Sequence, residues 1–234
     1  MYQELLSCVS LSVKAISPIE LSMNVLFVLA GEPPSSNLLR ASLDVADLSI
    51  GIDGGLTSFQ INGLIPDIHI GDLDSSQAIS ESSFKSIRIT DQETTDLEKA
   101  LDYVIDNYKP THITILGATG GRTDHLVNNL QILSTINNDI NITLKHDGSP
   151  QSNFELETLF RITARSHKLI PAVKGSILSI IYVSEFDGLQ TEGLKWDIQN
   201  GNSTTQFISQ SNIILHDNPT IKIDSGCVYV TVYQ

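Results

Sequence analysis

Four acidic clusters between residues 53 and 124 each follow an apolar run that has about the length of a β-strand. In an open α/β sheet, the carboxyl ends of neighbouring strands meet at one crevice, where ligands bind. Carboxylates gathered there in an acidic protein need a counter-charge, and a divalent cation with a phosphorylated substrate supplies one. The clusters are Asp53-Gly54-Gly55, Gly71-Asp72-Leu73-Asp74-Ser75, Thr94-Thr95-Asp96 and Gly120-Gly121-Arg122-Thr123-Asp124-His125.

The first half of the chain alternates strand and helix patterns, which is typical of an α/β fold with a mostly parallel sheet and flanking helices. Residues 24–30 form a continuous apolar run, as expected of a strand that is buried on both faces. Further strands are expected at 48–52, 67–70, 86–90, 112–116 and 140–145. Helices are expected from Ser35 or Ser36 to 46, through 61, from 96 to 108 and from 124 to 136.

The helix that begins at Asp96 has the clearest pattern. Thr95 and Glu98 have the spacing of a capping box, with Thr95 as the N-cap, and Leu97 and Leu101 begin an apolar stripe. The carboxylate of Asp96 is therefore expected in the first turn, beside the helix N-terminus.

After residue 147 the helical pattern disappears. Short apolar runs are separated by turns rich in Gly, Asn, Asp and Pro, which is typical of an all-β sandwich. We therefore expect an α/β domain at 23–147 and a β-sandwich domain at 148–234. Residues 1–22 are expected to be a leader extension that is a candidate for disorder, ahead of a candidate start at Met23. The runs lie at 176–183, 206–209, 212–215, 220–223 and 227–233.

The chain carries 27 acidic and 14 basic side chains, which gives a net charge of −13. This balance argues against a protein that binds nucleic acid or an anionic membrane, since either needs a basic face. It allows nucleotide binding, because a metal and backbone N–H groups can neutralise phosphates. No apolar run reaches the length of about 18 residues that spans a bilayer, and the first residues lack the basic start of a signal peptide.

The cysteines are too few and too far apart for a disulfide framework or a zinc site, because the chain has only Cys8 and Cys227. This usage fits a reducing cytosol. Cys227 lies in an apolar strand pattern, so it is expected to be a buried, inert thiol.

Asp72 and Asp74 are the strongest metal candidates. They lie two residues apart at the end of an expected strand, so both carboxylates point to one face. Mg²⁺ binds one or two carboxylates together with substrate phosphates; a solvated acidic loop is the alternative. Asp53 and Asp96 also have ordinary explanations, a hairpin-like bend and a favourable charge at a helix N-terminus. Only their place beside the other carboxylates makes them candidates.

The segment 117–122 lies between a strand and a helix and resembles a phosphate cradle. Backbone N–H groups, a helix N-terminus and Arg122 would all meet an anion there, although such glycines are often purely structural. It is not a Walker P-loop, since no Gly-Lys-Ser/Thr ends it. Asp124 is a candidate to bond a ribose or a metal and His125 to contact phosphate; the alternative for both is a structural place at the helix start.

Two polar features stand out in the second half. Trp196, the only tryptophan, lies in the turn-like segment Gly193-Leu194-Lys195-Trp196. It is a candidate either to stack on a flat heterocycle or to fill the core of the sandwich. The stretch Ser209-Gln210-Ser211-Asn212 is a candidate to bond a ligand amine, and equally a plain loop.

In their order and spacing, these motifs resemble those of thiamine pyrophosphokinases, and the resemblance runs from about residue 25 to residue 233. Each motif is weak alone, but the ordered set is highly specific. The resemblance includes Pro66-Asp67 ahead of the second cluster, Leu97-Glu98-Lys99-Ala100-Leu101 after the third, and Gly117-Ala118-Thr119 ahead of the fourth. Two positions depart from the family pattern: Ile213 follows Asn212 where Glu is common, and Ile52 precedes Asp53 where a small residue is usual.

The resemblance implies a homodimer with an ATP- and Mg²⁺-binding α/β domain, a thiamine-binding β-sandwich, and thiamine held between the subunits. Asp53 would lie on the thiamine side, and Trp196, Ser211 and Asn212 would reach the thiamine from the partner subunit. The expected Mg²⁺ ligands are Asp72, Asp74 and Asp96, and the expected ATP site comprises Gly120, Gly121, Arg122, Asp124 and His125.

The implied reaction is attack of the thiamine hydroxyl on the β-phosphorus of ATP, which gives thiamine diphosphate and AMP. Asp72 or Asp96 would help to take the hydroxyl proton. An enzyme of this kind is expected in the cytoplasm. Two alternatives are a related diphosphokinase that acts on a pterin alcohol and a non-catalytic module that senses ATP and Mg²⁺.

Overall fold

A computed structural model describes residues 22–71, 84–89, 91, 93–148, 153–164, 167–204 and 209–234. The expected metal ligands Asp72 and Asp74 lie outside these described residues. So do Cys8, the expected leader up to residue 21 and most of the expected strand at 206–209.

The first half of the fold is a parallel sheet with the strand order β6-β5-β1-β2-β3-β4. The chain builds the sheet to one side of β1 through β2, β3 and β4, and then to the other side through β5 and β6. The topological switch point therefore lies at β1, where ligands bind in such sheets. The strands are β1 (Asn24–Val28), β2 (Leu48–Ile52), β3 (Ile68–Ile70), β4 (Lys85–Ile87), β5 (His112–Leu116) and β6 (Asn141–Asp147).

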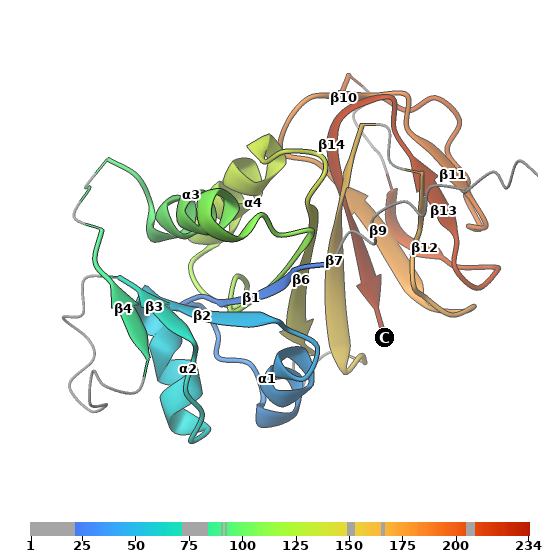
Figure 1. The fold of residues 1–234 in the computed structure, drawn as a ribbon. Helices are drawn as coiled ribbons and strands as arrows, with labels where there is room; N and C mark the ends of the chain where they lie inside the picture. The colour runs from blue at the N-terminus through green and yellow to red at the C-terminus, as the bar shows by residue number, and fades with distance from the viewer. Residues whose placement is uncertain are drawn as a thin grey trace, which may run out of the picture.

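Helices cover both faces of this sheet, as Figure 1 shows: α1 (Ser36–Leu43) and α2 (Leu56–Ile61) lie on one face, and α3 (Asp96–Tyr108) and α4 (Thr123–Thr135) on the other. Alternation along β1 explains the two layers. Leu26 and Val28 belong to the buried cluster that includes α1 and α2, whereas Val25 and Phe27 belong to the one that includes α3 and α4. All four side chains are buried, which confirms a strand covered on both faces.

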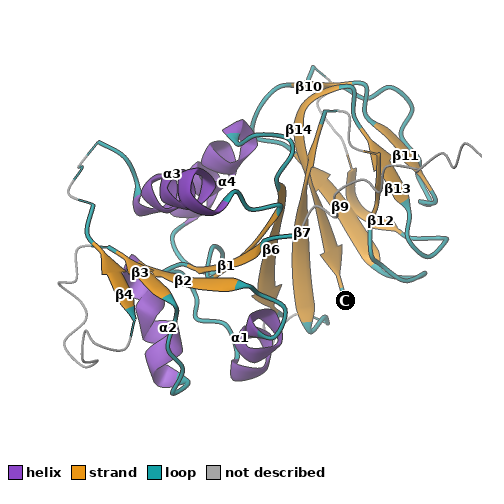
Figure 2. Cartoon of the chain, in the orientation of Figure 1, coloured by secondary structure: helices purple, strands orange, loops and turns teal. Residues whose placement is uncertain are grey.

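The second half extends the same sheet with antiparallel strands. β7 (Leu156–Thr163) pairs with β6, followed by β14 (Ser225–Tyr233), β9 (Ile177–Ile181) and β12 (Ser209–Ile213). A three-stranded sheet, β11-β13-β8, packs against this extension (Figure 2). The expected α/β region followed by an all-β sandwich is confirmed. The remaining strands are β8 (His167–Leu169), β10 (Phe186–Asp187), β11 (Gln190–Glu192) and β13 (Thr220–Lys222).

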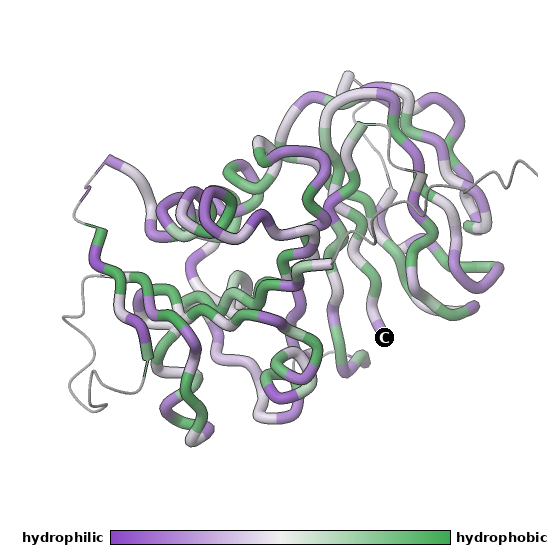
Figure 3. Tube along the Cα trace, in the orientation of Figure 1, coloured by the Kyte–Doolittle hydropathy of each residue, from purple (hydrophilic) through white to green (hydrophobic). Residues whose placement is uncertain are grey.

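Hydrophobic residues follow the strands through the centre of the molecule, as Figure 3 shows. Cys227 of β14 lies in this interior with 2% of its surface exposed. Burial raises the pKa of its thiol to about 11, so the expectation of an inert thiol is confirmed. Within the described part of the chain, no helix is long and apolar enough to cross a membrane.

β7 was not expected from the sequence, because Arg161 and neighbouring polar residues interrupt its apolar pattern. Arg161 is 2% exposed, and its guanidinium donates to four backbone carbonyl oxygens at the end of α4 and just beyond it. These carbonyls belong to Leu133, Ile136, Asn137 and Ile140, at distances of 2.9, 2.6, 2.8 and 2.6 Å. A charged residue can therefore occupy the centre of this sheet.

Candidate functional site

The carboxyl ends of β1, β2 and β5 and the N-termini of α3 and α4 line a cavity of about 880 Å³. Three segments at the strand ends line it: residues 29–31 after β1, 52–53 at the end of β2, and 117–118 after β5. This is the switch point of the parallel sheet. Of the expected site residues, the cavity brings together Asp53, Asp96, Gly121, Arg122, Asp124 and His125.

Two glycines allow the strand ends to lie this close together. Gly117 follows β5 with a φ of +67°, and a Cβ atom there would overlap the carbonyl oxygen of Leu29. A Cβ atom on Gly55 would likewise overlap the carbonyl oxygen of Val28. Larger residues would push these segments away from β1, so packing alone already requires these two glycines.

Asp53 begins a single 3-10 turn, η1 (Asp53–Gly55), which leads directly into α2. Because β2 and β3 are parallel, the alternative of a hairpin-like bend at this position is wrong. Asp53 has a φ of 45°, a left-handed conformation that costs a non-glycine residue about 1–3 kcal/mol. Its carbonyl oxygen lies 3.3 Å from Nε2 of the buried His69, and Asp53 lines the cavity.

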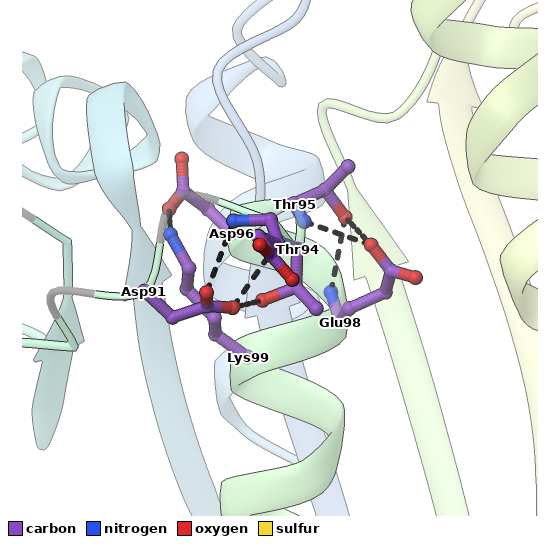
Figure 4. A network of polar contacts seen from close by, with 7 residues as sticks. Asp91, Thr94, Thr95, Asp96, Glu98 and Lys99 are labelled. Atoms are coloured by element: carbon purple, nitrogen blue, oxygen red, sulfur yellow. Dashed lines mark hydrogen bonds and ion pairs between the residues drawn. The ribbon is translucent and has the colours of Figure 1, made fainter.

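Figure 4 shows the polar network at the start of α3, in which Asp96 lies. The Thr95 hydroxyl accepts from the N–H of Glu98 at 3.3 Å, and the Glu98 carboxylate accepts from the N–H of Thr95 at 2.8 Å. The expected capping box is thus confirmed. The Asp91 carboxylate accepts from the hydroxyl and the N–H of Thr94, and the hydroxyl bond in particular lowers the pKa of Asp91. Since Thr95 and Glu98 complete the cap, the carboxylate of Asp96 is not needed for it.

Lys99 also lines the cavity, which was not expected from the sequence. Its ammonium group donates to Oδ1 of Asp96 at 3.1 Å, and the side chains of Lys99 and Asp96 are 11% and 44% exposed. Both residues line the cavity. Asp–Lys pairs three residues apart are common on solvated helix faces, so the spacing alone gave no signal. The burial of the Lys99 stem distinguishes this pair.

Arg122 and Asp124 form a two-point ion pair at the start of α4. The guanidinium donates through Nε to Oδ1 at 3.0 Å and through a terminal nitrogen to Oδ2. Hydrogen bonding to Asp124 raises the pKa of Arg122, and the same bonds lower the pKa of the Asp124 carboxyl. The two side chains are 75% and 62% exposed, so solvent weakens the pair and both groups can turn to a ligand.

The first two turns of α4 supply further polar groups to the cavity. Arg122 is the N-cap but makes no capping side-chain bond, so the cap supplies no side-chain acceptor to the backbone N–H groups of the first turn. His125 lies on the same turn. Asn128 and Asn129 also line the cavity. Neither was expected there, because amides on a helix carry no specific signal in the sequence.

A second cavity of about 470 Å³ lies on the other side of the glycine-rich loop. Gly120 and Thr119 line it, together with Ser211 of β12 and Glu157 of β7. Burial raises the pKa of the Glu157 carboxyl. The structure thus places Gly120 and Ser211 in this cavity rather than in the first.

The expected thiamine residues of the second half lie apart from the first cavity. Trp196 is 56% exposed, so the alternative that it fills the sandwich core is wrong. Asn212, in contrast, is fully buried and bonds to the backbone of Trp196. Neither residue lines the two cavities described above.

The carboxylates around the first cavity have the chemistry of a Mg²⁺ site. Asp53, Asp96 and Asp124 line the cavity and carry carboxylate oxygens, the kind of ligand that Mg²⁺ prefers over nitrogen or sulfur. Within the described ranges, no group of three His, Cys, Asp or Glu side chains is close enough to hold a metal. The described residues therefore fit such a site in kind. Of the three expected ligands, Asp96 lines the cavity, while Asp72 and Asp74 lie outside those ranges.

Two family models match this chain, one after the other. The description "Thiamin pyrophosphokinase, catalytic domain" matches residues 39–144, and "Thiamin pyrophosphokinase, vitamin B1 binding domain" matches residues 165–228. The first model covers the ends of β2 and β5 and the starts of α3 and α4 at the first cavity, and the second covers Trp196 and β12.

Curated relatives and solved structures agree with these matches. Thiamine pyrophosphokinase 2 of Oryza sativa subsp. japonica is 29% identical over 182 residues, which cover 70% of this chain and 64% of the relative. Thiamine pyrophosphokinase of Bacillus subtilis is 34% identical over 123 residues, 47% of this chain and 55% of the relative. The chain thus spans less than two thirds of the length of these two relatives. The crystal structure of a Bacillus subtilis thiamine pyrophosphokinase superposes with a TM-score of 0.71 at 22% identity, covering 90% of this chain and 99% of that one.

Proposed function

This chain belongs to the thiamine pyrophosphokinase family, and on that premise we propose that it transfers the pyrophosphoryl group of ATP to the hydroxyl of thiamine, giving thiamine diphosphate and AMP. One observation carries the proposal. The cavity at the switch point of the sheet gathers Asp53, Asp96, Arg122, Asp124 and His125 from three separate sequence motifs. Acidic and basic groups that meet in this way suit a metal-bound polyphosphate.

In this proposal the two halves of the chain divide the substrates. Residues 23–147 bind ATP with Mg²⁺, and residues 148–234 bind thiamine and form the dimer. The free, buried thiol of Cys227 supports the expected cytoplasmic location, because free thiols are typical of reducing compartments.

The start of α4 would hold the phosphates of ATP. The N-terminus of a helix attracts an anion through its free N–H groups and its dipole, and Gly121, which lines the cavity, lets the backbone approach closely. Arg122 would exchange one of its bonds to Asp124 for a phosphate oxygen, because both partners are exposed. Asp124 and His125 complete this ATP side.

Asp96, with Asp72 and Asp74, would hold the Mg²⁺ ion. When bound, Mg²⁺ would supply positive charge that offsets the negative charge developing as AMP leaves the pyrophosphoryl group. Lys99 supports this arrangement, since its ammonium group lies beside Asp96 and within the cavity. Its positive charge would hold Asp96 in place and remain near the phosphates.

A carboxylate would receive the proton of the attacking hydroxyl, and Asp96 and Asp72 are the candidates. The orientation of Asp96 supports it: the helix cap is complete without this side chain, and Lys99 fixes one of its oxygens. The second oxygen would then face the substrate hydroxyl, which is the geometry that a general base requires.

Thiamine would enter beside Asp53, whose strained backbone sets the carboxylate on the cavity wall. A second subunit would cover it with Trp196 and Ser211, two of the three residues that the resemblance implies for a homodimer; the third, Asn212, is buried. Trp196 and Ser211 are the exposed members of this set and the ones able to reach a ligand on a neighbouring subunit.

The test is to incubate the protein with ATP and Mg²⁺ together with thiamine, with a pterin alcohol, or alone, and to measure AMP. We expect AMP only with thiamine, in amounts equal to the thiamine diphosphate formed, and none after Mg²⁺ is chelated. The absence of AMP with thiamine would refute the proposal, and AMP with the pterin alcohol alone would redirect it to that substrate.

A further inference from the structure

Trp196 is exposed, but several hydrogen bonds hold the backbone of the loop that carries it. In the segment Gly193–Asp197, which we call the Trp196 loop, the N–H of Lys195 donates to the carbonyl of Ile213 at 2.8 Å. Leu194 also forms a β-bridge with Ile214. At the other end, the Asp197 carboxylate accepts from the N–H of Leu194 at 3.1 Å. The backbone is held from both sides while the indole itself is 56% exposed.

Asn212 is the side chain that joins β12 to Trp196. Its Oδ1 accepts from the N–H of Trp196 at 3.2 Å and of Ile213 at 2.9 Å. Its Nδ2 donates to the carbonyl of Trp196 at 2.8 Å and to Oγ of Ser209 at 3.0 Å. An amide offers two donor hydrogens and two acceptor lone pairs. All four are used, and the side chain is fully buried, so nothing remains to bind a ligand.

A β-bulge in β12 turns Asn212 inward. The register between β12 and β9 shifts between Ser209 and Asn212, and Ser211 within the bulge has a φ of 54°. The N–H of Ser211 donates to Oγ of Ser179 on β9 at 3.0 Å, which holds this conformation in place. As a result Ser211 is exposed and Asn212 is buried, the re-aiming that bulges produce near functional sites.

The face of the indole already accepts a cation. The ammonium group of Lys195 lies 4.6 Å from the centre of the Trp196 ring. A flat ligand with a delocalised positive charge would be attracted in the same way, and it would bind more tightly to a ring that is held in place beforehand.

We propose that Asn212 is a positioning residue that acts through Trp196: it fixes the backbone on which the indole stands and does not touch the substrate. The structure thereby gives Asn212 a role different from the thiamine contact that the resemblance implies. The part of this inference that concerns catalysis rests on the proposed function, because the indole is assigned to the thiamine rings. The part that concerns the loop does not.

The loop is tested first, without any ligand. Trp196 is the only tryptophan of the chain, so time-resolved fluorescence anisotropy reports its motion alone. We expect the indole to tumble with the whole protein in the unchanged chain and to gain a nanosecond component in Asn212→Ala. Asn212→Ser leaves a smaller gap and keeps a hydroxyl, and it serves as a second variant. Gln199→Ala removes an exposed amide three residues from Trp196 and is the matched control.

The substrate arm is a double-mutant cycle. We expect Asn212→Ala to raise the KM for thiamine about tenfold, in line with a lost aromatic contact, and to leave the KM for ATP unchanged. In a Trp196→Ala background the same change should add nothing, because its effect passes through the indole.

Two results would overturn the inference. One is an unchanged anisotropy decay in both folded Asn212 variants, with folding verified by circular dichroism. The other is an Asn212 effect that persists in full without Trp196, since that would mean direct contact with thiamine. If the unchanged protein forms no AMP from thiamine, the proposed function fails, and the anisotropy measurement still decides whether Asn212 fixes the loop.

Discussion

Asp96 and Lys99 show how two residues about one helix turn apart would serve the proposed polyphosphate site. The capping box at Thr95 and Glu98 starts α3 without help from Asp96, so this carboxylate is free for the cavity. Lys99 lies on the next turn, and its ammonium group donates to one carboxylate oxygen of Asp96 at 3.1 Å. The pair keeps both charges at the cavity wall in a fixed geometry, where a cation and a phosphate can each find the opposite charge.

Replacing Asp96 by Asn should lower the rate of AMP formation about a hundredfold or more, because an amide cannot hold Mg²⁺ as a carboxylate does. The Mg²⁺ concentration for half-maximal rate should rise as well. The melting temperature should change little, since the cap is unaffected. Calorimetric titration of ATP with Mg²⁺ provides a readout that does not depend on turnover.

Asp102→Asn is the matched control for that change, because Asp102 is an exposed carboxylate on the same helix. It should leave both the rate and the Mg²⁺ dependence as they are. Full activity in Asp96→Asn would remove Asp96 from the site.

Individual residues could be predicted from the sequence where local chemistry sets their position. Thr95 and Asp96 follow from the spacing of the capping box, and Arg122 from the strand–loop–helix pattern. Lys99 and Asn212 were misread or missed because their roles depend on burial and on contacts with distant backbone. Asn212 looks like a ligand contact in the sequence, and only the β12 bulge shows that it points inward.

At the scale of elements, α4 links the two halves of the molecule. Its N-terminus carries Arg122, Asp124 and His125 at the cavity. Two side chains of the sheet bond to its C-terminal part. Arg161 of β7 donates to the carbonyl of Leu133, and the hydroxyl of Tyr229 of β14 donates to the carbonyl of Leu130 at 2.6 Å. The antiparallel strands thus fix the helix that would hold the phosphates.

Arg161→Met should reduce the free energy of unfolding by about 3–5 kcal/mol, because several buried carbonyls of α4 and the loop beyond it lose their donor. Urea unfolding measures the loss. Arg88→Met, at an exposed arginine, should change the same quantity by less than about 0.5 kcal/mol. A loss below about 1 kcal/mol in Arg161→Met would mean that the four bonds contribute little.

The expected elements came closest to the structure where one pattern dominates. β2 and β5 have the expected bounds, because continuous apolar runs between clear breaks leave little choice. β7 was missed because Arg161 makes it look unlike a buried strand. The carbonyls that satisfy this arginine lie more than twenty residues away in sequence, at 133–140, and no local pattern reveals them.

At the scale of the whole molecule, a single sheet runs from β4 to β12. The domain boundary expected at 147–148 falls between β6 and β7, which are hydrogen-bonded neighbours in that sheet. The glycine and proline after β6 are typical of a linker. The sequence does not show that β7 returns to pair with β6.

This continuity predicts that both halves unfold together. Trp196 reports on the β-sandwich, and circular dichroism at 222 nm reports mainly on the helices of the first half. The two thermal transitions should coincide in one sample at a fixed protein concentration. A fluorescence midpoint several degrees from the dichroism midpoint would show that the halves unfold independently.

The β6–β7 pairing also constrains how such a chain can be inherited. A break between these strands would leave each half with an open row of backbone donors and acceptors, from Thr143 to Asp147 on one side and from Leu156 to Phe160 on the other. Exposed rows of this kind recruit whatever strand is nearby. Neither half can therefore be exchanged freely among genes as a module, because each half supplies the strand that pairs the open edge of the other.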